Sequence, residues 1–136
     1  MINGIVIGRQ PQIKVVVRIS GYPDLEIGCV INTGFEGALA LPVAAVTKLE
    51  LPYVASIDTI LANDENIVTP VHRATVVWDG VELEVPVLAM GSRPQIGTLL
   101  LNNCNLNIDF SDGSILSIDA LWAIVLLYFQ NFSVEK

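Results

Sequence analysis

Charge is scarce in this chain, and basic charge is especially scarce. Charged residues make up 15% of its 136 residues, and 7 Lys and Arg stand against 14 Asp and Glu, for a net charge of −7. The cationic residues are scattered and form no basic stripe, so we expect no nucleic acid as a partner. The hydrophobic content of 52% argues against disorder and predicts that some apolar surface lies at a subunit interface.

Side chains that bind metals are equally few. The two cysteines, Cys29 and Cys104, lack the spacing of a metal site, and His72 is the single histidine. A zinc site would therefore lack ligands, and we expect no metal and no cofactor. Two reduced, buried cysteines are the simpler interpretation, and a disulfide between them is the alternative.

Long apolar runs are missing as well. The longest, residues 120–129, has about half of the roughly 20 residues that span a bilayer. No charged segment precedes an apolar run at the N-terminus, so the sequence predicts no secretory signal. We therefore expect a cytoplasmic protein without a membrane partner.

Short, β-branched apolar runs separated by turn residues fill most of the chain. The expected strands are 2–8, 13–19, 25–31, 53–61, 67–78, 81–90, 106–110 and 115–118. Gln10-Pro11 is expected to break the first two apart, and residues 81–87 alternate as in a strand with one buried and one solvated face. Short helices are expected at 42–51 and after Gly97. The pattern predicts an all-β, barrel-like domain.

One polar turn stands out among these elements. The apolar run Cys29–Ile31 leads into Asn32-Thr33-Gly34, and residues 38–42 return to apolar character. A buried strand that ends in a tight turn would present the side chain of Asn32. Because glycine adopts backbone angles closed to other residues, Gly34 and Gly37 are expected to let the turn fold back under the next strand.

Two further segments complete the pattern. Residues 62–66 are polar turn formers between the strands 53–61 and 67–78, which predicts a β-hairpin with an exposed tip. The segment Ile96-Gly97-Thr98-Leu99-Leu100 reads as the end of a strand, a glycine turn and the start of a helix.

Together the three segments resemble the retropepsin-like aspartic proteases, most closely their small, single-domain bacterial members. In that family an apolar-apolar-Asp-Thr-Gly turn, a flap hairpin and an apolar-Gly-x-x-Leu segment behind the turn follow in this order. The resemblance covers residues 1–118, which we take as one protease domain. Residues 119–136 remain as an apolar C-terminal extension, expected at an interface or packed on the barrel.

The resemblance implies a closed barrel with one or two short helices, a flap hairpin, and a homodimer in which two turns meet across a two-fold axis. A peptide or protein substrate would lie between turns and flaps. By analogy, Thr33 would hydrogen-bond across the axis. The implied catalytic residues are Asn32 (at the position of the catalytic Asp), Thr33 and Gly34. The implied substrate-binding residues are Phe35, Glu36, Gly37, Ala62, Asn63, Asp64, Glu65 and Asn66. The implied supporting residues are Ile96 and Gly97.

Asn32 departs from the family pattern. The family mechanism needs two carboxylates about 3 Å apart that share one proton. One takes a proton from the attacking water while the other protonates the peptide carbonyl. An amide has nearly the size of a carboxyl group but cannot accept that proton. We therefore expect this chain to be an aspartic endopeptidase by family that binds peptide without cleaving it as written.

Several alternatives remain beside this interpretation. Asn32 fits both an engineered inactivating change and a natural loss of the carboxylate. The chain could instead be a non-catalytic peptide-binding or dimerisation module on the same fold. More distantly, it could be an unrelated small β-barrel in which Asn-Thr-Gly is only a turn. In a flap, Asp64 and Glu65 would favour basic or neutral peptides.

Overall fold

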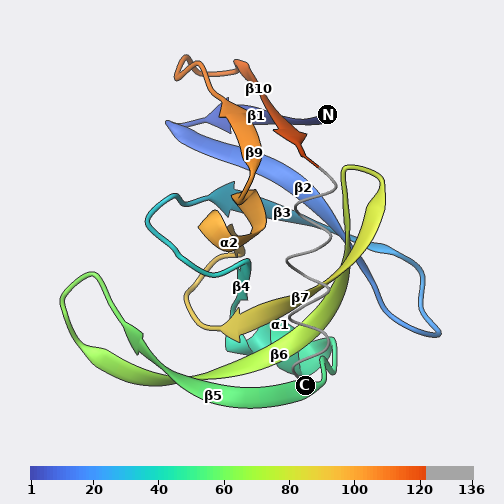
Figure 1. Cartoon of the computed structure of the whole chain (residues 1–136), viewed down its shortest axis with the longest axis vertical. Coiled ribbons are helices and arrows are strands. Elements are labelled where there is room, and N and C mark those ends of the chain that lie inside the picture. Colours follow the sequence, from blue (N-terminus) through green and yellow to red (C-terminus); the bar gives the residue numbers. More distant parts are fainter. Residues whose placement is uncertain (122–136) are drawn as a thin grey trace.

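A computed structural model of the chain describes residues 1–121, which are built mainly of β-strands (Figure 1). The strands are β1 (Ile2–Ile7), β2 (Gln10–Arg18), β3 (Leu25–Ile31), β4 (Leu39–Leu41), β5 (Tyr53–Ile60), β6 (Asn66–Trp78), β7 (Val81–Ala89), β8 (Gln95–Ile96), β9 (Cys104–Asn107) and β10 (Ile115–Ala120). The helices are α1 (Val43–Lys48) and α2 (Thr98–Leu101). The predicted all-β class with two short helices is confirmed for these residues.

The expected domain boundary falls inside a strand. β10 continues past residue 118, and Asp119 and Ala120 pair with Asn105 and Cys104 of β9. The extension expected at 119–136 therefore begins as the end of a strand, and its residues 122–136 lie outside the described part of the chain.

The sheet closes on itself. Its strand order is β5-β6-β7-β4-β8-β3-β2-β1-β10-β9, and β6 also pairs with β2. That extra pairing, with Val17 opposite Val76, makes a ring of β2, β3, β8, β4, β7 and β6. Side chains of the ring strands fill the core, among them the fully buried Leu39, Trp78 and Ile96. β1, β10 and β9 extend the sheet beyond β2.

The first hairpin turns earlier than the sequence predicted. Gly8 and Arg9 have φ of 55° and 65°, the left-handed pair of a two-residue hairpin turn, and β2 starts directly after them. The prediction that Gln10-Pro11 breaks the strand is wrong. Pro11 lies opposite Val6, whose N–H donates instead to the carbonyl of Ser114 at 2.9 Å. The missing N–H of proline therefore interrupts no bond between the strands.

Strand β7 alternates only in its first half. Leu83 is buried between the exposed Glu82 and the half-buried Glu84, as predicted, but residues 85–89 are all buried. The second half of β7 lies between β6 and the fully buried β4, with which it pairs in parallel. The sequence of this half is apolar throughout, as is typical of a strand that is buried on both faces.

Helix α1 is shorter than the expected 42–51. Pro42 precedes its first residue, and the chain leaves the helix at Glu50, whose φ is 52°. The N–H of Leu51 donates to the carbonyl of Val46 at 3.3 Å, and that of Glu50 to Thr47 at 3.1 Å. These two bonds are the Schellman ending of a helix, here with Glu50 in the place that glycine usually takes.

The hairpin predicted around residues 62–66 is present. β5 and β6 pair in antiparallel register up to Ile60 opposite Asn66. At the tip, the N–H of Asp64 donates to the carbonyl of Leu61 at 2.9 Å, and Asp64 itself has a φ of 64°. The side-chain oxygen of Asn63 accepts the N–H of Glu65 at 3.1 Å. Residues 62–66 are all exposed, as predicted.

Candidate functional site: the Asn32 turn

The backbone around Asn32 is organised by the two-residue strand β8. β8 lies between β3 and β4, parallel to β3 with Ile31 opposite Ile96, and antiparallel to β4 with Leu39 opposite Ile96. The turn at residues 32–38 therefore leaves one neighbour of β8 and returns as the other (Figure 1). The N–H of Asn32 donates to the carbonyl of Ile96 at 2.9 Å, which ties the first residue of the turn to β8.

Helix α2 closes the turn from behind. The first N–H groups of a helix have no partner within it. In α2 they donate to carbonyls of the turn: Thr98 to Phe35 at 2.8 Å and Leu99 to Gly37 at 3.2 Å. The Thr98 hydroxyl also donates to the carbonyl of Phe35, at 3.3 Å. The turn and the start of the helix therefore satisfy each other's backbone groups.

The position of Gly97 has room for no side chain larger than that of glycine. It is buried, and a Cβ on it would overlap the carbonyl oxygen of Gly37 and lie 2.5 Å from that of Phe35. Its own N–H donates to the carbonyl of Ala38 at 3.1 Å. Only glycine lets the segment pass this close behind the turn.

The two glycines of the turn serve a different purpose from the one expected. Neither Gly34 nor Gly37 has a positive φ, so the prediction that they supply unusual backbone angles is wrong. A Cβ on Gly34 would lie 3.3 Å from the side-chain oxygen of Asn32, and one on Gly37 would overlap the ring of Phe35. Both glycines make room for a neighbouring side chain.

The side chain of Asn32 is exposed, and hydrogen bonds at both ends of its amide fix its orientation. Its Oδ1 accepts the N–H of Gly34 at 2.9 Å, and its Nδ2 donates to Oε1 of Gln95 at 2.9 Å. The carbonyl of Asn32 accepts the N–H of Phe35 at 3.1 Å. Sequence reasoning did not single out Gln95 as a site residue. Its one signal was its position directly before Ile96-Gly97.

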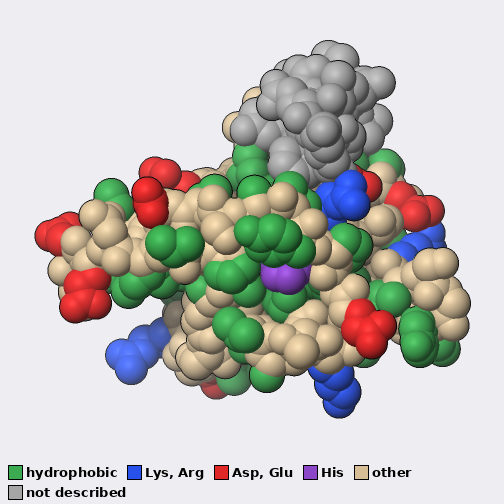
Figure 2. All heavy atoms as spheres, turned by 90° about the horizontal axis from the view of Figure 1, so that it is seen from below, with side chains coloured by type: hydrophobic (Ala, Val, Ile, Leu, Met, Phe, Trp, Pro, Cys, Tyr) green, Lys and Arg blue, Asp and Glu red, His purple; other side chains and the backbone are tan. Residues whose placement is uncertain are grey.

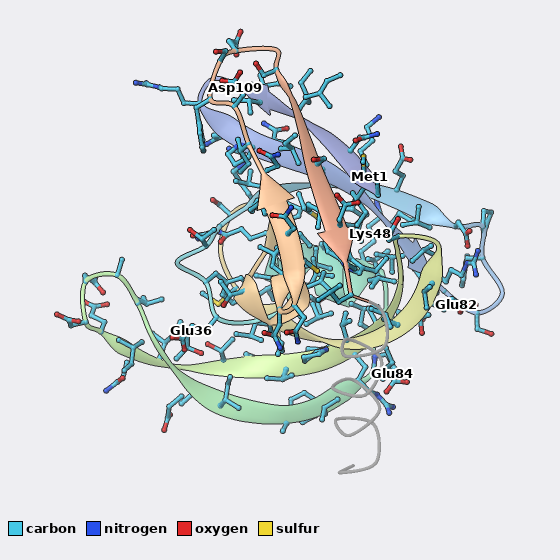
Figure 3. All side chains as sticks on the ribbon, turned by 45° about the horizontal axis from the view of Figure 1, so that its top comes forward. Met1, Glu36, Lys48, Glu82, Glu84 and Asp109 are labelled. Carbon is cyan, nitrogen blue, oxygen red and sulfur yellow. The ribbon has the colours of Figure 1, made fainter. Side chains whose placement is uncertain are left out.

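The other turn residues divide between the surface and the interior. Thr33 is exposed, and its hydroxyl has no hydrogen-bond partner among residues 1–121. Phe35 is half-buried, and its ring lies against Gly37 and Gly97, so it supports the turn from within. Glu36 is exposed and lies on the side of the turn that faces the β5–β6 hairpin (Figure 3).

The β5–β6 hairpin projects on the same side of the molecule as the turn (Figure 1). Ile57 lies opposite Thr69, and Thr59 opposite Ile67, on one face of the hairpin. This face points inward at Thr69, which is 1% exposed. Ile57, directly opposite Thr69, and Ile67, nearer the tip, are 44% and 36% exposed. No hydrogen bond or ion pair joins the tip, Ala62–Asn66, to the turn within the described residues.

The opposite, outer face of the hairpin is apolar as well. Figure 2 shows hydrophobic side chains gathered around the one histidine on this surface. Tyr53 and Val68 are 60% and 70% exposed, and the Tyr53 ring meets that of His72 edge-on at 5.6 Å. This is apolar surface of the kind that the composition led us to expect. Its burial between subunits stays a prediction.

No cluster of His, Cys, Asp and Glu within residues 1–121 could hold a metal ion. Cys29 and Cys104 are both free thiols, so the disulfide alternative is not realised in the structure. Burial raises the pKa of Cys29 to about 12, which keeps its thiol protonated at neutral pH.

Comparison with known proteins adds no assignment: no family model, no curated protein and no solved structure matches this chain. Among the described residues, no helix is both long and apolar enough to cross a membrane.

Proposed function

We propose that this chain is a retropepsin-like protein that acts as a homodimer, holds an extended peptide between its Asn32 turns and its β5–β6 flaps, and hydrolyses peptide bonds when Asp stands at position 32. The observation that carries the proposal is the threading of β8 between β3 and β4, with Ile96-Gly97 bonded to the back of the turn. An ordinary surface turn needs no such support. A turn that must present one side chain in a fixed place does.

A second chain is needed to complete the site. Proton sharing requires two side chains about 3 Å apart, and one chain has one such turn. Asn32 and Thr33 are exposed, so a second turn has access to them. The free hydroxyl of Thr33 supports the expected bond across the two-fold axis. These features favour closed, two-fold assembly over a site within one chain.

The peptide would lie in extended form beneath the flap. The inner face of the hairpin offers the exposed Ile57 and Ile67, and Glu36 borders the same space from the turn. An apolar surface with a few polar groups is typical of a peptide-binding cleft. Glu36, together with Asp64 and Glu65 at the tip, favours a neutral or basic peptide.

The test is the variant Asn32→Asp, assayed for cleavage of unfolded protein at about pH 4 to 6, where a carboxyl dyad shares one proton. We expect cleavage that an aspartic-protease inhibitor blocks, and none from the unchanged chain. Asn105→Asp, an exposed residue of β9, is the matched control and should remain inactive. The molar mass measured by light scattering should be that of a dimer, and a strict monomer at high concentration would refute the proposal.

The alternative, a non-catalytic peptide-binding module, has one observation in its favour. Both polar ends of the Asn32 amide have hydrogen-bond partners, the N–H of Gly34 and the side chain of Gln95, so an amide fits this turn without strain. If Asn32→Asp stays inert while the unchanged chain binds peptide, this alternative replaces the enzyme.

A further inference from the structure

We infer that Gln95 is a positioning residue of this site: its amide orients the side chain at position 32 and, when Asp stands there, holds that side chain as the carboxylate. The inference rests on the proposed function for its catalytic meaning. The contact itself does not depend on it, since residues 32 and 95 are joined in the structure at 2.9 Å.

The orientation follows from one fixed donor. The backbone N–H of Gly34 can only donate, so the atom of Asn32 that faces it at 2.9 Å must be the oxygen. Nδ2 of Asn32 then points to Gln95, and Gln95 must present its own oxygen. The hydrogen bonds from Gly34 through Asn32 to Gln95 therefore fix which end of each side-chain amide is the oxygen and which is the nitrogen.

Gln95 is well placed to hold a partner still. It lies in β8, with its backbone paired to Val30 on one side and to Ala40 on the other. It is half-buried, and its Nε2 lies 3.7 Å from the position a Cβ would take on Gly91. A half-buried side chain whose backbone is held between two strands loses less freedom on forming a hydrogen bond than one on a free loop.

A carboxylate at position 32 would reverse the roles. One oxygen would still accept from Gly34, and the other would face Gln95 with no hydrogen to give. A half-turn of the Gln95 amide exchanges its oxygen for its NH₂ group and restores the bond, now donated by Gln95. Donation to the charged form favours that form and lowers the pKa of the carboxyl group.

Within one chain, few other charges act on this position, to which the proposed dimer brings the second carboxylate of the pair. Within the described residues, β4, β8 and α2 carry no charged side chain. On β3, Glu26 pairs with Lys14 at 3.5 Å. Arg93, before β8, donates to Gln10 at 2.6 Å, and Glu36 lies in the turn. The flap tip adds Asp64 and Glu65. The carboxylates among these raise the pKa at position 32, so the donor from Gln95 acts against them.

The test compares the carboxyl titration of residue 32 by ¹³C NMR in Asn32→Asp and in Asn32→Asp with Gln95→Met. Met keeps the length of Gln and has no donor. We expect the lower apparent pKa of the site to rise by about one unit or more when the donor is lost. The acid limb of the pH–rate profile should move by the same amount. Gln12→Met, a half-buried residue of β2, is the control and should leave both unchanged.

A change of less than about 0.3 units in this pKa, which is on the order of the measurement error, would overturn the inference. If Gln95→Met does not fold, Gln95→Glu serves instead: a second carboxylate in place of the donor should raise the pKa further. The titration needs no turnover. If no peptidase activity is detected, the proposed function is refuted, and the titration still decides the role of Gln95.

Discussion

Replacement of Gly97 by Ala tests the close packing behind the turn. The new methyl group would overlap the carbonyl oxygen of Gly37 and lie 2.5 Å from that of Phe35. Neither carbonyl can swing away freely, because they accept the N–H groups of Leu99 and Thr98 at 3.2 and 2.8 Å. Relief therefore requires the turn to separate from α2.

The magnitude follows from two contributions. Overpacking a tight site costs about 1–3 kcal/mol, and each backbone hydrogen bond that is broken costs about 0.5–1.5 kcal/mol. We expect Gly97→Ala to lower the free energy of unfolding by about 2–6 kcal/mol, a large share of the 5–15 kcal/mol typical of a domain. The measurement is urea unfolding followed by tryptophan fluorescence, with the midpoint and slope fitted separately.

Gly28→Ala is the matched control. Gly28 lies in β3, leading to the same turn, has no positive φ, and has no atom within 4 Å of its Cβ position. We expect this change to be neutral or to stabilise by up to about 1 kcal/mol, since glycine weakens a strand interior. Gly37→Ala should fall between the two, because only the Phe35 ring must move. A Gly97→Ala protein within about 1 kcal/mol of Gly28→Ala would refute the reasoning.

Three further predictions follow from single residues. Glu50→Gly should raise the free energy of unfolding by about 0.5–1 kcal/mol in urea, because Glu50 ends α1 with a φ of 52°. Burial raises the pKa of Cys29 from 9.0 to about 12, so the free energy of unfolding should fall as the pH increases above 9, where only the unfolded thiol ionises. Alkylation of Cys29 at pH 8 should therefore require unfolding. Rapid labelling of the folded chain would contradict this prediction. Ile57→Ser should weaken peptide binding in a titration with unchanged stability, since Ile57 is 44% exposed.

Local sequence was enough to predict some elements. The β5–β6 hairpin was predictable because Asn63 and Asp64 supply their own turn: one side chain caps a backbone N–H, and the other residue tolerates the left-handed angle. β3 and the helix after Gly97 followed from apolar runs that end at glycine or polar residues. At the hairpin tip, the determining contacts lie within a few residues.

The features that sequence reasoning missed depend on distant partners. Gln95 is 63 residues from Asn32, and nothing near it in sequence indicates that its amide meets that side chain. Pro11 remains in a strand because the N–H of Val6 is already used by Ser114. The closure of the ring by β2 and β6 likewise follows from pairing between remote strands.

The proposed dimer requires that two Asn32 turns, one from each chain, form a single site. It is tested most directly by refolding Asn32→Asp chains with unchanged chains in varying proportion and measuring inhibitable peptide cleavage. With equal amounts, random pairing leaves roughly one quarter of dimers with two carboxylates, so activity should fall as the square of the Asp fraction. A linear fall to about half would place a complete site within one chain, and no cleavage at any proportion would contradict the peptidase itself.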